Sequence, residues 1–498
     1  MAIVLPHGVL FRGAAEGEIR KRLLDKGLLD TIIGLPSNLF TNTGIPVVVM
    51  VLKKNRNIGD PVLVIDASRS FIKVGKQNVL EEKDIAKIVD TYSNRMEIPG
   101  YSHLATREEI IDNDYNMNIP RYVESIDSEI PHDVDAHILG GIPQKNIEEL
   151  SVLNLSVPDI LDNSLNPIRP GYVELINAID DLTEEVLRDS RIINKTNEVA
   201  AKTEEYISKY WDSLRNVTRP TDILQLREEM LDEIKQLLSE FKFIDVYDGY
   251  QIIADIWKEA LTHDSELIAA SDFYAVARTR EPNMVTKGTG KNKREEQDGW
   301  VGSIVPNELI AERLYTEELN EIKNKQSRVQ EVDIELSELV EAAKVEDTDE
   351  NNALYEVIKK NEEDEPQDSF ENKTVKSELK NARKGTTEYD LLKKVDELMA
   401  EKAMLGKAIK AEEKTLKEMV YDRIMSLTNE EIDGLVHEKW FGNVVADLVN
   451  LVTIPLKADL RTLDMLNKRY ANTLSELDTE IRTLEEAFET LMSEMVVE

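Results

Sequence analysis

Short apolar runs separated by polar, helix-patterned segments make up the first 65 residues of the chain. Four of these runs predict β-strands, at residues 2–5, 31–35, 45–52 and 61–66. The first is expected to be buried, because it starts with no polar lead-in. Between the first two runs, residues 16–26 carry apolar side chains at helical spacing, and Gly27 follows as a helix C-cap. Continuously apolar strands are typical of sheets covered on both faces, so the pattern predicts an α/β fold.

The connection between the second and third predicted strands is too short for a helical crossover. Residues 36–46 are rich in Asn, Thr and Gly, which suits a β-hairpin. The third strand should therefore run antiparallel to the second. We expect a mostly parallel sheet that ends in an antiparallel hairpin.

Helical patterns dominate the rest of the chain. An amphipathic helix is predicted at 80–95, and longer helices at 172–209, 221–243 and 248–261. Beyond residue 306 the apolar residues repeat as heptads, and near the end they fall every seven residues, at Leu463, Tyr470, Leu477, Leu484 and Leu491. Such heptads predict coiled-coil seams. The pattern leaves open whether the helices pair within the chain or dock on another subunit.

The overall charge is strongly acidic. Among 498 residues, 61 are Lys or Arg and 97 are Asp or Glu, which gives a formal net charge of −36. An acidic surface repels phosphate backbones, so any contact with nucleic acid needs a local basic patch or a basic partner. A basic loop near residues 278–298 is the candidate patch, with phosphate contacts at Lys287, Lys291, Lys293 and Arg294. The alternative is a solvated, mobile loop.

Several kinds of chemistry are excluded by composition. The chain has no cysteine, which removes disulfides, thiolate nucleophiles and cysteine-bound zinc, and fits a cytoplasmic protein. Its six histidines show no metal-ligand spacing; His132 and His137 lie five apart, and we favour a loop or cap over a metal site. No apolar run approaches the roughly 18 to 20 residues that span a bilayer, so no membrane contact is expected.

Three sequence segments resemble a known family. The run IVLPHGVLFRGAAEGEIRKRLLDKGLLDTIIGLPSNLFTNTGIPVVVMVLKK, the segment VLVIDAS at 62–68 and the segment IIDNDYNMNIPRYV at 110–123 resemble the modification (M) subunit of type I restriction-modification systems. The close resemblance covers about the first 125 residues. It implies a Rossmann-like adenine-N6 DNA methyltransferase that uses S-adenosylmethionine.

Two motifs of that family are missing from the sequence. Its chemistry rests on an N-P-P-F/Y tetrapeptide and a glycine-rich cofactor loop, and both precede the region of resemblance. The single Asn-Pro pair here is Asn166-Pro167, followed by Ile168, and the single G-x-G is at 288–290 in a polar stretch. The resemblance therefore implies the C-terminal portion of such a subunit, with no catalytic or cofactor-binding residue of its own and inactive alone.

The resemblance also suggests residues around the target base. The loop at 36–46 lies where the family has a wall of the base pocket, so Phe40 would stack on the base and Asn42 and Thr43 would line the rim. A hydrophobic plug under the loop is the alternative for Phe40. Pro6, His7 and Gly8 would line the same crevice from the first strand. A general-base role for His7 is disfavoured, because the amine can attack directly.

The predicted fold class is α/β plus α. The half Rossmann-like sheet at 1–125 would be followed by a helical domain at 126–305 and coiled-coil helices at 306–498. The resemblance implies three partners, namely a specificity subunit, a restriction subunit and double-stranded DNA, with DNA recognition left to the specificity subunit. The alternative function is a non-catalytic scaffold that binds a specificity subunit through its coiled coils.

Overall fold

A computed structural model describes residues 1–41, 44–124, 130–287, 293–345, 349–362 and 365–495. The chain divides into two compact units. The first unit comprises Met1–Leu214, Asp222–Thr262 and Asn443–Glu498, and the second comprises Arg215–Thr221 and His263–Gly442.

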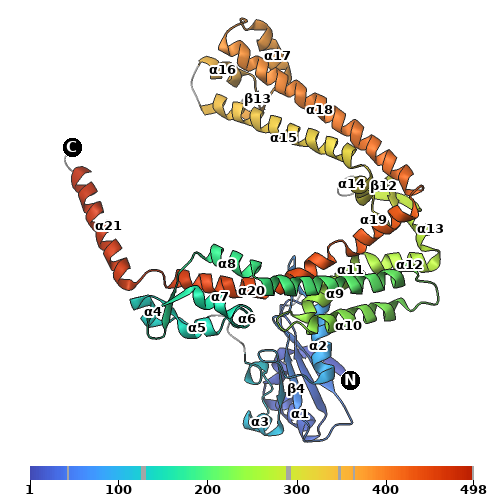
Figure 1. Ribbon diagram of the computed structural model, residues 1–498, viewed down its shortest axis with the longest axis vertical. Helices are drawn as coiled ribbons and strands as arrows, with labels where there is room; N and C mark the ends of the chain where they lie inside the picture. The colour runs from blue at the N-terminus through green and yellow to red at the C-terminus, as the bar shows by residue number, and fades with distance from the viewer. Residues whose placement is uncertain (42–43, 125–129, 288–292, 346–348, 363–364, 496–498) are drawn as a thin grey trace. The chain divides into compact units, whose positions relative to one another are not determined.

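A five-stranded mixed sheet forms the N-terminal part of the first unit (Figure 1). Its strands, in spatial order, are β1 (Ala2–Pro6), β3 (Val47–Leu52), β2 (Leu29–Gly34), β4 (Val62–Asp66) and β7 (Ser102–Ala105). The predicted hairpin is confirmed, because β2 and β3 pair antiparallel. Strand β3 lies between β1 and β2 and is antiparallel to both, while β2 and β4 are parallel.

Two expectations about this sheet are wrong. Only the β2–β4 pair is parallel among the described pairs of this sheet, so it is mixed rather than mostly parallel. Strand β1 is not buried: it is an edge strand, and Val4 is 53% exposed. The returning strand β3 takes the interior place beside β2, which leaves β1 outermost despite its apolar sequence.

Helices cover both faces of the sheet, as continuously apolar strands require. One face packs with α1 (Ala14–Asp25) and α3 (Arg107–Asp112), through a core that includes Leu24 and Ile110. The other packs with α2 (Glu82–Asn94) through Ile88 and Tyr92. Gly27 has a φ of +61°, so α1 ends at a left-handed glycine, as predicted.

The remainder of the first unit is largely helical. Its longer helices are α8 (Ile179–Arg188), α9 (Ser190–Arg215, which reaches into the second unit by one residue), α10 (Ile223–Ser239), α11 (Val246–Ile256) and α20 (Val444–Arg469). A small sheet of β8 (Ile142–Pro143), β10 (Tyr172–Leu175) and β9 (Leu165–Arg169) was not expected, and its central strand β10 replaces the predicted start of a helix at 172. Short helices α4 (Val134–Leu139), α5 (Gln144–Glu148), α6 (Ser151–Ser156) and α7 (Pro158–Asn163) surround it.

The second unit contains two long helices that run side by side, α15 (Thr316–Val345) and α18 (Thr387–Ile424) (Figure 1). Charged pairs join them, including Lys325 to Glu412 at 2.6 Å and Arg328 to Glu401 at 2.8 Å. A small cap closes one end of the pair, built from α16 (Asp349–Glu356), β13 (Ile358–Lys360), β14 (Pro366–Phe370) and α17 (Asn372–Asn381).

A β-hairpin occupies most of the stretch that was expected to be a basic loop. Strands β11 (Arg280–Lys287) and β12 (Arg294–Gly302) pair antiparallel. Arg280, Lys287 and Arg294, which suggested a basic loop, lie within these two strands. Helices α12 (Thr262–Ala270), α13 (Phe273–Ala277), α14 (Asn307–Leu314) and α19 (Asn429–Phe441) complete the described elements of this unit.

The last heptad series does not form one seam. A break at 470–473 separates α20 from α21 (Leu474–Met495). Leu463 and Tyr470 are buried, whereas Leu477, Leu484 and Leu491 are 40%, 63% and 60% exposed. The coiled-coil prediction is therefore not confirmed, and the structure shows a helical hairpin and a separate exposed helix.

One helical stretch, Asn429–Arg469, is long and apolar enough by composition to cross a membrane. Many of its apolar side chains are core residues, such as Trp440, Leu448, Leu460 and Leu463. Core helices of soluble proteins pass the same test, so this stretch is weak evidence for a membrane span.

Candidate functional site

The carboxyl ends of three strands meet at one edge of the N-terminal sheet. Strands β1 and β2 are both antiparallel to β3, and β2 is parallel to β4, so β1, β2 and β4 run in one direction. They end at Pro6, Gly34 and Asp66. Ligand sites of α/β sheets lie outside the carboxyl ends of their strands, and this edge is therefore the candidate site.

The start of β3 holds the ends of its two neighbours together. The backbone N–H of His7 donates to the carbonyl oxygen of Pro46 at 3.2 Å, and that of Leu35 donates to Val47 at 3.0 Å. On the other side, the N–H of Ala67 donates to the carbonyl oxygen of Gly34 at 3.0 Å. These backbone bonds fix the positions from which the loops at the edge depart.

His7 and Asp66 are the ionisable pair of this edge. Burial lowers the pKa of the half-buried His7, and the nearby Asp66 carboxylate partly offsets that effect. The imidazole is therefore neutral near pH 7 and offers one acceptor and one donor. Asp66 Oδ1 accepts a hydrogen bond from the Ser68 backbone N–H at 3.0 Å. Asp66 was not singled out from the sequence, although its place directly after an apolar strand was the available signal.

Neighbouring side chains occupy the space beside two glycines at this edge. A Cβ on Gly34 would lie 2.5 Å from Ile119 Cδ1, and a Cβ on Gly8 would lie 2.7 Å from the Arg12 guanidinium. Gly34 therefore leaves no open cradle for a phosphate or a nucleoside, whereas the exposed, flexible Arg12 side chain can move away from Gly8.

The loop after β2 carries the predicted target-base residues. Phe40 is 46% exposed, so it is not a plug under the loop, and its proposed stacking role stays a prediction. Asn42 and Thr43 lie outside the described residues. The loop is held at its start by Asn78, whose side-chain amide donates to the carbonyl oxygen of Ser37 at 2.7 Å.

The segment that follows α3 closes the other side of the edge. The buried Arg20 donates from Nε to the carbonyl oxygen of Tyr115 at 2.7 Å and from Nη1 to that of Val9 at 2.8 Å. The N–H of Met117 donates to the carbonyl oxygen of Leu10 at 3.0 Å. These bonds tie residues 115–117 to the segment after β1, and the role of Pro6, His7 and Gly8 in lining the base crevice stays a prediction.

The predicted phosphate-contacting residues belong to the second unit. Lys287 and Arg294 face each other across the β11–β12 pair, and both approach Glu296, at 4.0 and 3.4 Å. Lys293 precedes β12, and Lys291 lies outside the described residues. Glu296 offsets part of this positive charge, and a DNA contact here stays a prediction.

The charge is distributed unevenly along the chain, and this signal was missed. Residues 1–80 contain eleven Lys or Arg and six Asp or Glu, for a net charge of +5. Residues 81–498 contain 50 basic and 91 acidic residues, for a net charge of −41. The strands of the candidate site thus belong to a basic region of an acidic chain.

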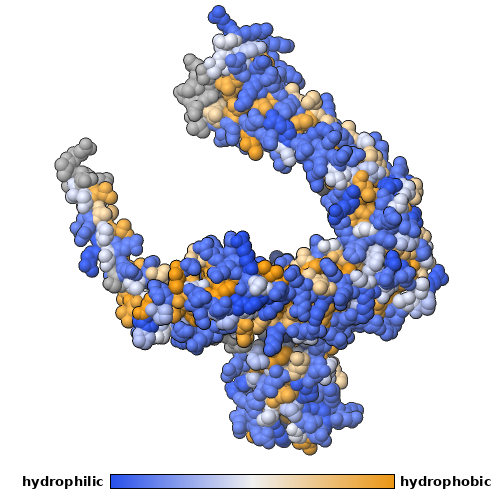
Figure 2. Space-filling model, viewed as in Figure 1, coloured by the Kyte–Doolittle hydropathy of each residue, from blue (hydrophilic) through white to orange (hydrophobic). Residues whose placement is uncertain are grey.

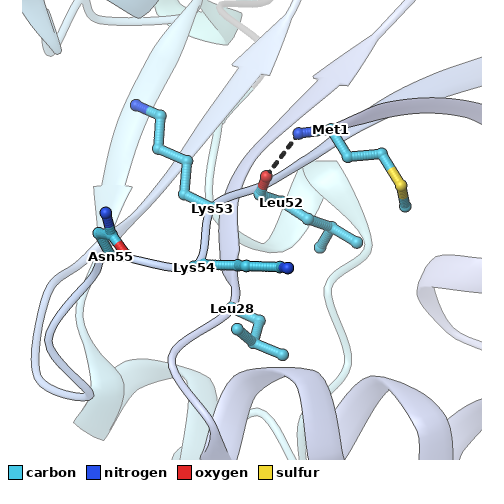
Figure 3. Close-up of a pocket in the computed structure, with 6 residues that line it drawn as sticks. All are labelled: Met1, Leu28, Leu52, Lys53, Lys54 and Asn55. Carbon is cyan, nitrogen blue, oxygen red and sulfur yellow. Dashed lines mark hydrogen bonds between the residues drawn. The ribbon is translucent and has the colours of Figure 1, made fainter.

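A separate apolar pocket lies at the opposite edge of the sheet. Figure 3 shows Leu28 and Leu52 beside the chain's first residue, whose amino group donates to the Leu52 carbonyl oxygen at 2.8 Å. Lys53, Lys54 and Asn55 complete the lining. The pocket is at the amino ends of β1 and β2, so it is remote from the candidate site.

His132 and His137 do come together, with Nδ1 and Nε2 only 2.8 Å apart. His137 packs edge-on against Tyr470 at 4.9 Å between ring centroids. Within the described ranges no three His, Cys, Asp or Glu side chains are grouped as a metal site. The two rings stack beside the start of α4, which contains His137 and is capped by Asp133.

The N-terminal region is similar to known proteins. Residues 1–130 match the family model described as N-6 DNA Methylase. The methylase subunit of the type I restriction enzyme MpnII from Mycoplasma pneumoniae is 34% identical over 178 residues, which is 36% of this chain and 30% of that protein. The MjaVII methylase subunit from Methanocaldococcus jannaschii is 38% identical over 179 residues, 35% of this chain and 29% of that protein.

A solved structure is more similar in sequence. The methyltransferase subunit of a type I restriction-modification system from Streptococcus thermophilus is 56% identical and covers 25% of this chain and 26% of that one, with a TM-score of 0.25. The family match over residues 1–130 confirms the resemblance found in the sequence for that region. The chain spans about 30% of the length of the curated relatives it matches.

Proposed function

We propose that this chain supplies the target-base side of an adenine-N6 DNA methyltransferase of the type I restriction-modification class. The family match over residues 1–130 carries the proposal. It is supported by the carboxyl edge of the sheet, where the loop with the exposed Phe40 lies beside the strand ends at His7 and Asp66.

In this role the chain binds and shelters a flipped adenine. The exposed ring of Phe40 offers a stacking face, and stacking against an aromatic side chain compensates for the stacking lost in the duplex. The neutral imidazole of His7 offers a hydrogen bond at the same edge. No residue here is assigned to proton removal.

S-adenosylmethionine would supply the methyl group, but the residues at this edge do not fit it. Ile119 fills the space beside Gly34, so this glycine forms no cradle for a nucleoside. The motif through which the family holds the reacting amine does not occur in the sequence. We therefore assign both the cofactor site and the N-P-P-F/Y motif to a separate segment.

The free edge of β1 offers a place for that segment. One edge of β1 pairs antiparallel with β3, where Ile3 lies opposite Met50 and Leu5 lies opposite Val48. The other edge of β1 pairs with no strand in the part of the chain that the structure describes. An unpaired edge is a template for a further strand, and we propose that the catalytic segment continues the sheet there.

A second candidate function is a scaffold for a specificity subunit. Helix α21 favours it, because its apolar residues are exposed (Figure 2). A helix with one unpacked apolar stripe is suited to pack against a helix of another subunit. We propose α21 as the contact with the specificity subunit, within a complex that also holds a restriction subunit and double-stranded DNA in the cytoplasm.

Cofactor binding separates these functions. Equilibrium dialysis of the full chain with labelled S-adenosylmethionine should give no binding. Adding the N-terminal segment of a related methylase subunit that contains N-P-P-F/Y should restore cofactor binding. Tight binding by the chain alone would contradict the assignment of the cofactor site. Association with a specificity subunit without restored cofactor binding would favour the scaffold.

A further inference from the structure

A small exposed hairpin hangs from the carboxyl end of β4. It consists of β5 (Ile72–Val74) and β6 (Gln77–Val79), joined by a turn at Gly75, whose φ is +63°. The stretch from 67 to 80 contains Arg69, Lys73 and Lys76 and no acidic residue. In a chain of net charge −36, fourteen residues without a carboxylate form a local positive surface.

The charged side chains of this hairpin point into solvent rather than into ion pairs. Lys73 and Lys76 are exposed, and neither pairs with a carboxylate of the described chain. Ile72, Val74 and Val79 are also exposed, at 43%, 56% and 39%. Ile72 lies opposite Val79 in the register, so these three residues share one face of the ribbon.

The hairpin is fixed to the candidate site. Asn78 is 5% exposed and lies in β6; besides its side-chain bond to Ser37, its backbone N–H donates to the carbonyl oxygen of Asn38 at 3.0 Å. Lys73 lies directly opposite Asn78 in the register. The hairpin and the loop that carries Phe40 are therefore held as one body at the carboxyl edge of the sheet.

We infer that the β5–β6 hairpin is a DNA-binding element of this chain, which contacts the duplex beside the flipped base. Lys73 and Lys76 bind backbone phosphates, and the apolar face of Ile72 and Val74 lies against sugars and base edges in a groove. The inference rests on the proposed function for the nature of the DNA substrate.

Charge and shape both favour DNA as the occupant. A two-stranded ribbon fits the major groove, and apolar side chains of minor-groove proteins insert between base steps. Lysines without a carboxylate partner can bind DNA phosphates, and the release of the counterions condensed on the DNA favours this binding. A protein partner covering the same apolar face is the competing outcome, and the experiment separates the two.

The salt dependence of DNA binding is the test. The full chain is titrated against a duplex with a mismatched adenine, which lowers the cost of flipping, and its affinity is measured over a range of salt concentrations. The double variant Lys73→Gln/Lys76→Gln should bind about tenfold more weakly at low salt and reduce the slope of log K against log salt by about 2. The matched control Lys407→Gln/Lys410→Gln removes the same charge from exposed positions of α18 and should leave both values unchanged.

A cross-link identifies the occupant directly. Because the chain has no cysteine, Val74→Cys creates a single thiol at an exposed position, to which a photo-reactive group is attached. Cross-links to DNA would support the inference. It would be overturned by cross-links to protein alone, by an unchanged salt slope, or by no DNA binding by the full chain. Methyl transfer is not measured, so a failure of the proposed activity leaves this result readable.

Discussion

Ile119 occupies the space that a side chain on Gly34 would need, with its Cδ1 2.5 Å from the ideal Cβ position. Gly34 ends β2, and Ile119 belongs to the segment that closes the candidate site. The contact explains why the strand ends in glycine, because no larger residue fits without displacing Ile119.

Gly34→Ala should destabilise the first unit by about 1–3 kcal/mol, the usual cost of overpacking. Ile119→Val removes the clashing methyl group, so it should recover most of that loss in the double variant. Urea unfolding of the single and double variants measures both effects. Gly59→Ala is the control, because a Cβ there meets no atom within 4 Å. An additive double variant would contradict the packing argument.

Asn78→Ala should loosen the loop that carries Phe40. The variant leaves the carbonyl oxygen of Ser37 without its 2.7 Å donor, at a cost of about 1–3 kcal/mol. Amide hydrogen exchange of residues 35–41 should accelerate. Asn94→Ala is the control, because it removes only an exposed bond to the carbonyl oxygen of Asp90. Unchanged exchange in Asn78→Ala would show that the loop is held by other contacts.

The stability of the sheet should depend on pH through His103. Its burial lowers the pKa, but the carboxylates of Glu109, at 2.9 Å, and Glu97, at 2.5 Å, outweigh burial and raise it overall. A raised folded pKa means that the stabilisation is complete below the unfolded value of 6.5 and is lost as pH rises through the folded pKa.

The corresponding experiment compares unfolding free energies at acidic and mildly alkaline pH. We expect stability to fall by about 1 kcal/mol as pH rises through this window, because the pair is half-exposed. His103→Gln should remove this part of the pH dependence. A variant with the wild-type pH profile would mean that another group titrates.

Helix α21 should contribute to assembly and little to folding. Leu484 and Phe488 are 63% and 64% exposed, so Leu484→Asp/Phe488→Ser should change the unfolding free energy by less than about 0.5 kcal/mol. The same variant should fail to co-purify with a specificity subunit. Glu485→Gln/Glu489→Gln on the polar side is the control. Normal co-purification of the apolar variant would remove α21 from the interface.

Local patterns in the sequence predicted four of the five strands of the N-terminal sheet and its hairpin, but not β7. Continuous apolar runs identified β2, β3 and β4, and the short loop between β2 and β3 predicted their antiparallel pairing. Strand order was not predictable, because the apolar content of β1 is the same whether it lies at the edge or inside. The prediction that β1 is buried was therefore wrong.

Heptads and charges were harder to interpret. The repeat from Leu463 to Leu491 continues across a helix break, because a seven-residue count does not record where the backbone turns. At the site, the roles of Pro6, His7 and Gly8 stay predictions from the resemblance, whereas Asp66 and the β5–β6 hairpin were not singled out from the sequence. Total charge hid the hairpin, since a net charge of −36 conceals a basic region of 80 residues.

Methyl transfer by a reassembled enzyme tests the central claim most directly. The full chain is mixed with the N-terminal segment of a close relative that contains N-P-P-F/Y, with a specificity subunit, duplex DNA and labelled S-adenosylmethionine. We predict N6-methyladenine only when every component is present, and none when the asparagine of the motif is replaced by alanine. Methylation by the chain without the segment, or none from the complete mixture, would contradict the account.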